Sequence, residues 1–136
     1  MADYAKLLPQ VTADTQPYWD GLKAHRLRLQ RCADCGQVRH YPRPVCDACF
    51  SMRVEWIDAS GRGRVHSWTT TYHPFHLGFR PDLPYTLLTV DLDEGVRMNA
   101  QLRGLDPGEL RIGLPVQVEF ERATDEVTLP VFVPAR

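Results

Sequence analysis

Hydrophobic and polar side chains alternate in one segment of the second half of the chain, a pattern typical of a half-buried β-strand. In segment 115–121, Val116, Val118 and Phe120 alternate with polar residues. Together with β-branched and aromatic enrichment, such patterning predicts five strands, at 64–72, 85–92, 96–102, 115–121 and 127–133. Pro130 lacks a backbone donor, so the last strand should place it at an edge or bulge. Five short strands with little helix favour a small closed barrel, for which we expect the OB-fold.

The first part of the chain shows two other patterns. Residues 17–24 predict a short helix, on which Tyr18 and Leu22 share a face. Apolar residues then alternate at 26–31, and 53–57 resembles a further strand. We therefore expect a mainly β chain in three parts: an N-terminal arm with a short helix at 1–25, a cysteine-containing unit at 26–57, and the barrel at 58–136.

The four cysteines form two Cys-x-x-Cys pairs, Cys32 with Cys35 and Cys46 with Cys49. Two thiolates three positions apart on a tight turn can bind one ion, and two such turns complete a tetrahedral shell, so the spacing predicts zinc. Two disulfides and rubredoxin-like iron are the alternatives. We favour thiols over disulfides because we recognise no signal peptide, and a cytosolic setting keeps thiols reduced. A closed four-sulfur shell has no open position, so the ion should be structural.

Composition and charge narrow the class of protein. The chain has 136 residues, which suits one compact domain with a small appendage, and a formal net charge of -1. Non-specific nucleic-acid binding depends on a basic surplus that this chain lacks. The charge is uneven, because residues 17–43 are basic and residues 105–126 are acidic. No apolar run approaches the roughly 20 residues that span a bilayer, so we expect a cytoplasmic protein without a membrane partner.

The longest irregular segment is expected at 73–84, between the first two barrel strands. A loop of this length in so small a domain is typically functional or disordered, and its three prolines argue against disorder. Phe75, Leu77 and Phe79 are more apolar than a solvated loop requires. They should either plug the mouth of the barrel or meet a ligand or partner.

Several short motifs, taken in order, resemble a known family. They are Tyr-Trp-Asp-Gly-Leu at 18–22, Leu-Arg-Leu-Gln-Arg-Cys-Ala-Asp-Cys-Gly at 27–36, Gly-Arg-Gly-Arg-Val-His-Ser-Trp-Thr at 61–69, Pro-Tyr at 84–85, Leu-Asp-Glu-Gly at 92–95 and Gly-Leu-Pro-Val at 113–116. Over about residues 15–134 the chain resembles the zinc-ribbon and OB-fold proteins first described as domain of unknown function 35, which are associated with acyl-CoA. Asp47 departs from the pattern, since many relatives have proline after the third cysteine.

The resemblance implies both a fold and a partner. The fold would be a helical N-terminal piece, a rubredoxin-like zinc ribbon and a C-terminal five-stranded OB-fold barrel. Members resemble accessory subunits of thiolase-like enzymes, which include thiolases, acyltransferases and aldolases. In such assemblies the partner would hold the catalytic residues, and this subunit would help to form the acyl-CoA binding channel. A non-catalytic role agrees with the cysteine pattern, because the metal would leave no thiol to act as a nucleophile.

An acyl-CoA ligand needs cations for its phosphates and an apolar groove for pantetheine and the acyl chain. The candidate ligand-binding residues are Arg26, Arg28, Arg39, Arg43, Trp68, Phe75, Phe79 and Tyr85. Alternatively, the arginines are solvated or balance the charge of the metal cage, and Trp68 and Tyr85 belong to the barrel core. The competing class is a module that binds single-stranded nucleic acid, which the acidic C-terminal half disfavours. A scaffold without ligand contact is a third interpretation.

Overall fold

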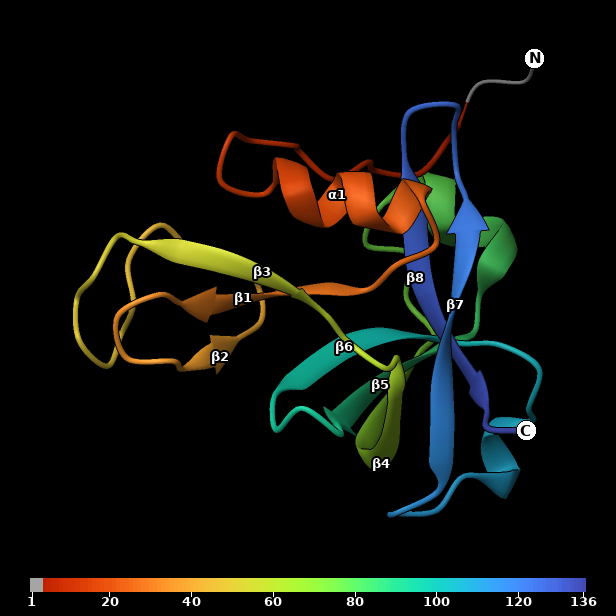
Figure 1. Cartoon of the computed structure of the whole chain (residues 1–136). Helices are drawn as coiled ribbons and strands as arrows, with labels where there is room; N and C mark the ends of the chain where they lie inside the picture. Colours follow the sequence, from red (N-terminus) through yellow and green to blue (C-terminus); the bar gives the residue numbers. More distant parts are fainter. Residues whose placement is uncertain (1–3) are drawn as a thin grey trace.

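A computed structural model describes residues 4–136 as two β units together with one α-helix (Figure 1). Residues 1–3, with which the predicted N-terminal arm begins, lie outside the described residues. The elements in chain order are α1 (Gln16–Lys23), β1 (Arg28–Cys32), β2 (Val38–Arg39), β3 (Val54–Asp58), β4 (Arg62–Thr71), the 3₁₀-helix η1 (Leu77–Asp82), β5 (Tyr85–Leu92), β6 (Arg97–Leu102), the 3₁₀-helix η2 (Pro107–Glu109), β7 (Pro115–Arg122) and β8 (Thr128–Pro134).

The smaller β unit is an antiparallel sheet in the order β2-β1-β3, which lies to one side of the barrel in Figure 1. Its central strand β1 pairs Gln30 with Arg39 of β2 and with Trp56 of β3. The pattern predicted β1 and β3 to within two residues but missed β2. A strand of two residues is too short to show any alternation.

The larger β unit is a closed barrel in the order β4-β5-β6-β8-β7, with β7 returning to β4. The β6 and β8 strands are parallel and all other neighbours antiparallel, so the predicted five-stranded OB-fold is confirmed. Each predicted strand ends within two residues of the observed one. Pro130 pairs with Phe120 of β7, while the pairing of β8 with β6 begins only at Val131. The proline therefore precedes the stretch in which β8 has two neighbours, as expected for a residue without a backbone donor.

One hydrophobic core joins the helix to both β units. Tyr18, Trp19 and Leu22 of α1 are buried in the same cluster as Leu88 and Phe132 of the barrel. The helix contacts β1 of the small sheet and β7 and β8 of the barrel. This shared core holds the cysteine-containing sheet against one face of the barrel.

The β4–β5 loop differs from its prediction. Residues 77–82 form η1, and the Nδ1 atom of His76 accepts a hydrogen bond from the Gly78 N–H at 3.1 Å. Phe75 and Leu77 are 84% and 73% exposed, so neither of them plugs the barrel. The expectation of an irregular segment was wrong because a 3₁₀ turn needs no hydrophobic period. Among residues 4–136, no helix is long and apolar enough to cross a bilayer.

Candidate metal centre and adjoining groove

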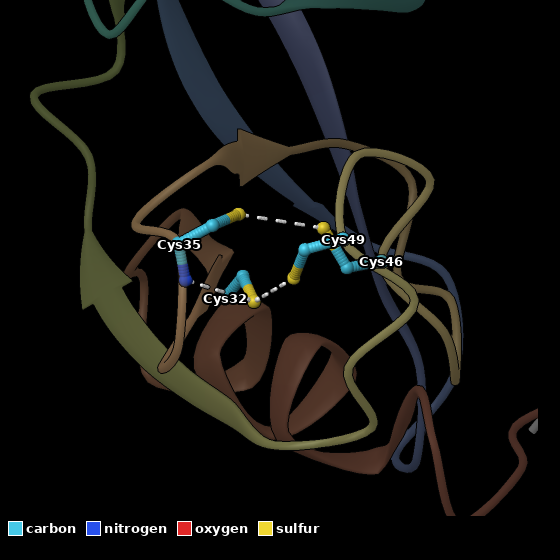
Figure 2. A group of neighbouring side chains, drawn as sticks. All are labelled: Cys32, Cys35, Cys46 and Cys49. Carbon is cyan, nitrogen blue, oxygen red and sulfur yellow. Dashed lines mark hydrogen bonds between the residues drawn. The ribbon is translucent and has the colours of Figure 1, made fainter.

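The four cysteine side chains point toward one another at the far end of the small sheet (Figure 2). Their sulfur atoms all lie within 4.8 Å of one another. The Cys32–Cys49 and Cys35–Cys46 sulfur pairs are each 3.6 Å apart. Sulfur atoms bound tetrahedrally to zinc at about 2.3 Å are about 3.8 Å from one another, so the cluster has the dimensions of a zinc shell.

Two similar turns position these thiols. The Cys32 carbonyl accepts from the Gly36 N–H, and the Cys46 carbonyl accepts from the Phe50 N–H, both at 2.9 Å. The backbone N–H of Cys35 lowers the pKa of Cys32 to about 6, aided by that of Asp34. Backbone N–H groups also lower the pKa of Cys46, with that of Cys49 the main cause. At Cys32 and Cys46 the turns therefore favour the thiolate, the form of cysteine that binds metal, whereas desolvation and the neighbouring thiols raise the pKa of Cys35 and of Cys49.

The donor set fits a structural ion and leaves no place for catalysis. Cys32 and Cys46 are buried, whereas Cys35 and Cys49 are exposed, so the cluster lies at the surface of the sheet. Four sulfur ligands fill a tetrahedral shell and exclude substrate from it. The four-cysteine cluster therefore supports structural zinc.

The four predicted arginines fall into two separate groups. Arg26 and Arg28 each lie 3.8 Å from a carboxylate oxygen of Asp58. Arg39 is only 2% exposed, and its Nε donates to Oε1 of Gln30 at 2.7 Å. That same oxygen accepts from the backbone N–H of Arg43 at 2.8 Å. This placement favours a structural role for Arg39 over the predicted phosphate contact, while Arg26 and Arg43 remain exposed.

Of the four aromatic residues predicted to bind the ligand, only Phe79 and Tyr85 contact each other. The rings of Phe79 and Tyr85 lie 5.7 Å apart between centroids. Trp68 is 37% exposed and Phe75 more so, and neither is paired with those two rings in the described part of the chain. Trp68 and Tyr85 are not among the buried core residues either, so the alternative that they are barrel core was wrong.

A groove runs along the outer face of β5 and β6, between the barrel and the small sheet. Its first section has a volume of about 290 Å³. Leu87, Asn99 and Gln101 form its floor, while Tyr41, which follows β2, and Phe79 of η1 line its walls. We call this cavity, together with its continuation below, the β5–β6 groove. The corresponding face is a common ligand-binding face of OB-folds.

The groove continues into a second cavity of about 410 Å³, where Tyr85 and Leu105 contribute apolar surface. Lys6 and Arg103 lie at the boundary, since both line both cavities. Lys6 Nζ is 2.7 Å from Asp82, and this hydrogen bond raises the pKa of Lys6. The Arg103 guanidinium contacts both carboxylate oxygens of Glu121 at 3.0 Å. Sequence reasoning missed both cations, because nothing in their local sequence distinguishes them from solvated surface residues.

His40 lines the groove and packs against the rings of both Tyr18 and Tyr41, which also contact each other. The ring centroids are 5.4 Å and 5.6 Å from that of His40. Burial, aided by the nearby charge of Arg43, lowers the pKa of His40 to about 4. Its Nδ1 atom is buried and has no hydrogen-bond partner among residues 4–136. The imidazole is therefore neutral at neutral pH and packs as an aromatic side chain.

Family models divide the chain as the structure does. The model described as ChsH2, rubredoxin-like zinc ribbon domain, matches residues 19–55. The model described as ChsH2, C-terminal OB-fold domain, matches residues 56–121. The boundary between them falls within β3, at the junction of the small sheet and the barrel.

Relatives and a solved structure match most of this chain. The chain is 39% identical over 127 residues to a probable enoyl-CoA hydratase alpha subunit of Thermomonospora curvata, covering 93% of this chain but 39% of the relative. It is 32% identical to the benzoylsuccinyl-CoA thiolase subunit BbsA of Thauera aromatica, covering 76% and 69% of the two chains. A chain of the Ltp2-ChsH2(DUF35) aldolase superposes with a TM-score of 0.85 at 38% identity, covering 95% of this chain and 100% of that chain.

The two family models together match most of the described chain, and the relatives are subunits of enzymes that act on CoA thioesters. The match to the aldolase chain extends from the cysteine cluster to the barrel. This chain belongs to the ChsH2 family of zinc-ribbon and OB-fold proteins, also described as DUF35.

Proposed function

We propose that this chain is a non-catalytic accessory subunit that binds a thiolase-like enzyme and helps to form its acyl-CoA binding channel. The observation that carries the proposal is the convergence of all four cysteines in one closed cluster. Acyl transfer of the thiolase kind needs a free thiol nucleophile, and a metal-bound chain has none. The bond-making groups therefore belong to another polypeptide. The names of the relatives as subunits of hydratase and thiolase complexes support this division of work.

The metal would hold the small sheet in shape. Cys32, Cys35, Cys46 and Cys49 would bind zinc, which supplies a cross-link between two turns and no open coordination position. Apolar packing contributes little to holding the two turns together, since Val45 and Phe50 near the second turn are exposed. We also propose that the three parts of the chain divide at 1–25, 26–57 and 58–136, near the boundary of the family models.

The β5–β6 groove provides the surface for the acyl-CoA. Phe79, Tyr85 and Leu87 offer an apolar lining of the kind that pantetheine and acyl chains require. Lys6 and Arg103 lie at the boundary between the two cavities, paired with Asp82 and Glu121, and an anionic group bound there would share these cations with the carboxylates. Of the predicted ligand-binding residues, Phe79 and Tyr85 take part in this groove, whereas Arg39 serves the fold.

Reconstitution tests the accessory role. The tagged full chain is purified from its native host with its partner, which mass spectrometry identifies, and each component is assayed separately and together with CoA thioesters. We expect a thiolase-like partner, turnover by the pair, and none by this chain alone. Robust turnover by the isolated chain, or a partner of another class, would refute the proposal.

A substitution in the groove tests the channel role. Asn99→Trp fills the floor of the groove from an exposed position on β6, and Arg111→Trp adds the same ring at an exposed site away from both cavities. We expect Asn99→Trp to weaken calorimetric acyl-CoA binding to the complex at least about 10-fold, with Arg111→Trp unchanged. Light scattering verifies that both complexes assemble. Equal affinity in the two variants would contradict the placement of the channel.

A further inference from the structure

Two carboxamide side chains follow one another along the floor of the β5–β6 groove. Asn99 and Gln101 are two positions apart on β6, so both lie on the same face of the barrel. Their Cα atoms are about 7 Å apart along the strand. Both side chains line the first section of the groove, and Gln101 also lines the second. The floor therefore presents two amide groups in a row in the direction of the groove.

In both side chains the carbonyl oxygen already accepts a hydrogen bond within the protein. The Thr89 hydroxyl donates to Oδ1 of Asn99 at 2.8 Å. Arg103 Nη1 donates to Oε1 of Gln101, also at 2.8 Å. A guanidinium has donors alone, so this contact fixes the orientation of the Gln101 amide. The same guanidinium contacts both carboxylate oxygens of Glu121 at 3.0 Å, which holds Arg103 in place.

The nitrogen of each carboxamide is the group that remains for a ligand. Neither Nδ2 of Asn99 nor Nε2 of Gln101 has a hydrogen-bond partner among residues 4–136. Asn99 is exposed and Gln101 half-buried, so water or a ligand must satisfy these donors. The bonds to the carbonyl oxygens polarise both amides and strengthen their N–H groups as donors. The two side chains therefore offer a ligand chiefly N–H donors.

A row of donors selects how the acceptors of a ligand are arranged. In an extended peptide each residue directs its N–H and its C=O to the same side, so a floor that binds a peptide strand must supply donors and acceptors in alternation. In the pantetheine arm of a CoA thioester, four bonds separate the two amide carbonyl carbons. When the arm is extended, this even number turns both C=O groups to one side, about 5 Å apart, and both N–H groups to the other. A floor of donors therefore fits pantetheine better than a peptide strand.

The dimensions and the apolar lining of the groove agree with this ligand. The strand spacing of the two residues exceeds the spacing of the carbonyls by about 2 Å, which the side-chain torsions of Asn99 and Gln101 can absorb. Leu87 and Phe79 beside the floor suit the methylene groups between the amides. The N–H groups of the ligand then face the open side of the groove, where water can accept from them.

We propose that Asn99 and Gln101 recognise the pantetheine arm, each donating an amide N–H to one of the two amide carbonyls of a chain that lies extended along β6. This inference rests on the proposed function and deepens it by naming the part of the ligand that the groove binds and the direction in which it lies. The donor row and its spacing carry the inference, since they favour pantetheine over a peptide in the same groove.

Isosteric substitutions remove the donors and retain the internal contacts. Asn99→Asp and Gln101→Glu each exchange NH₂ for oxygen, while the other oxygen still accepts from Thr89 or Arg103. Gln117→Glu is the matched control, since Gln117 is half-buried like Gln101 but lies on β7, outside both sections of the groove. The probe is S-ethyl pantetheine, which has both amides, no charge and no reactive thioester. Its neutrality removes any net attraction or repulsion by the added carboxylates.

Each variant is measured by calorimetry as the zinc-loaded full chain in complex with its co-purified enzyme. We expect Asn99→Asp and Gln101→Glu each to bind S-ethyl pantetheine at least about 10-fold more weakly, because a carbonyl of the ligand then faces an oxygen, with Gln117→Glu unchanged. Light scattering verifies that the complexes assemble.

A spectroscopic measurement on the wild-type chain does not depend on the variants. Asn99 is the only asparagine of the chain, so its side-chain NH₂ signal in an isotope-labelled protein is identified without further assignment. We expect the NH₂ signals of Asn99 and Gln101 to shift as S-ethyl pantetheine is added, and that of Gln117 to stay in place. Binding without any shift of the first two signals would overturn the inference, even where a variant fails to assemble.

The remaining outcomes separate this inference from the proposed function. Affinities of both donor variants for S-ethyl pantetheine within about twofold of the wild type would overturn the inference and leave the accessory role intact. Tighter binding of the peptide acetyl-Val-Thr-Val-methylamide than of S-ethyl pantetheine, lost in both variants, would identify a peptide strand as the occupant and overturn it as well. If the wild-type complex binds neither S-ethyl pantetheine nor a CoA thioester, the proposed channel fails together with this inference.

Discussion

Replacement of His40 by phenylalanine should remove part of the acid sensitivity of this protein. The imidazole packs against Tyr18 and Tyr41, and its buried Nδ1 has no hydrogen-bond partner among residues 4–136, so a phenyl ring can occupy the same place without leaving a polar atom unsatisfied. In the folded chain the pKa of His40 is about 4, compared with 6.5 for an unperturbed histidine. The unfolded chain therefore binds more protons than the folded chain between these two values. Stability is lost as the pH falls through this window.

The magnitude follows from the two pKa values. At pH 7.5 the imidazole is neutral in both states, and its contribution to the pH dependence is close to zero. At pH 5.5 protonation of the unfolded chain lowers the free energy of unfolding by about 1.3 kcal/mol relative to pH 7.5. With a urea m-value of about 1.5 kcal/mol/M, this corresponds to a midpoint shift of about 0.9 M.

The assay compares wild type and His40→Phe by urea titration at pH 7.5 and 5.5, with zinc present throughout and tryptophan fluorescence as the signal. Both proteins retain the cysteines and carboxylates, so the difference between their pH dependences isolates His40. We expect similar midpoints at pH 7.5 and a midpoint for His40→Phe about 0.9 M higher at pH 5.5. Equal losses of stability in the two proteins would refute the assigned burial of His40.

Three further substitutions probe the barrel and the metal centre. Phe132→Ala removes a ring of 0% exposure and should cost about 3–5 kcal/mol in urea titrations, where a loss below about 1 kcal/mol would contradict the assigned core. Gly63→Ala puts a Cβ 2.5 Å from the Asp91 carbonyl oxygen, which forces β4 and β5 apart and should lower the free energy of unfolding by at least about 2 kcal/mol. An unchanged urea midpoint would count against the pairing register of β4 with β5. Cys46→Ser should abolish stoichiometric zinc in elemental analysis, and full retention would exclude a four-sulfur shell.

Local periodicity explains how much of the fold was predictable. Apolar and polar residues alternate over six or more positions in β6 and β7, and β-branched and aromatic residues mark β4, β5 and β8. Two elements escaped prediction because they carry no such period: the two-residue β2 and the 3₁₀-helix η1. Local sequence also did not predict the exposure of Trp68. This residue lies on a predicted strand, but its side chain is 37% exposed.

The sequence by itself determined the cysteine pairs and the five barrel strands, because each depends on spacing within a few residues. Only the tertiary structure decided that Arg39 is buried against Gln30, and that Lys6 and Arg103 meet at one groove. These residues come from segments far apart in the chain, and burial or convergence of side chains is a property of packing that no local spacing encodes.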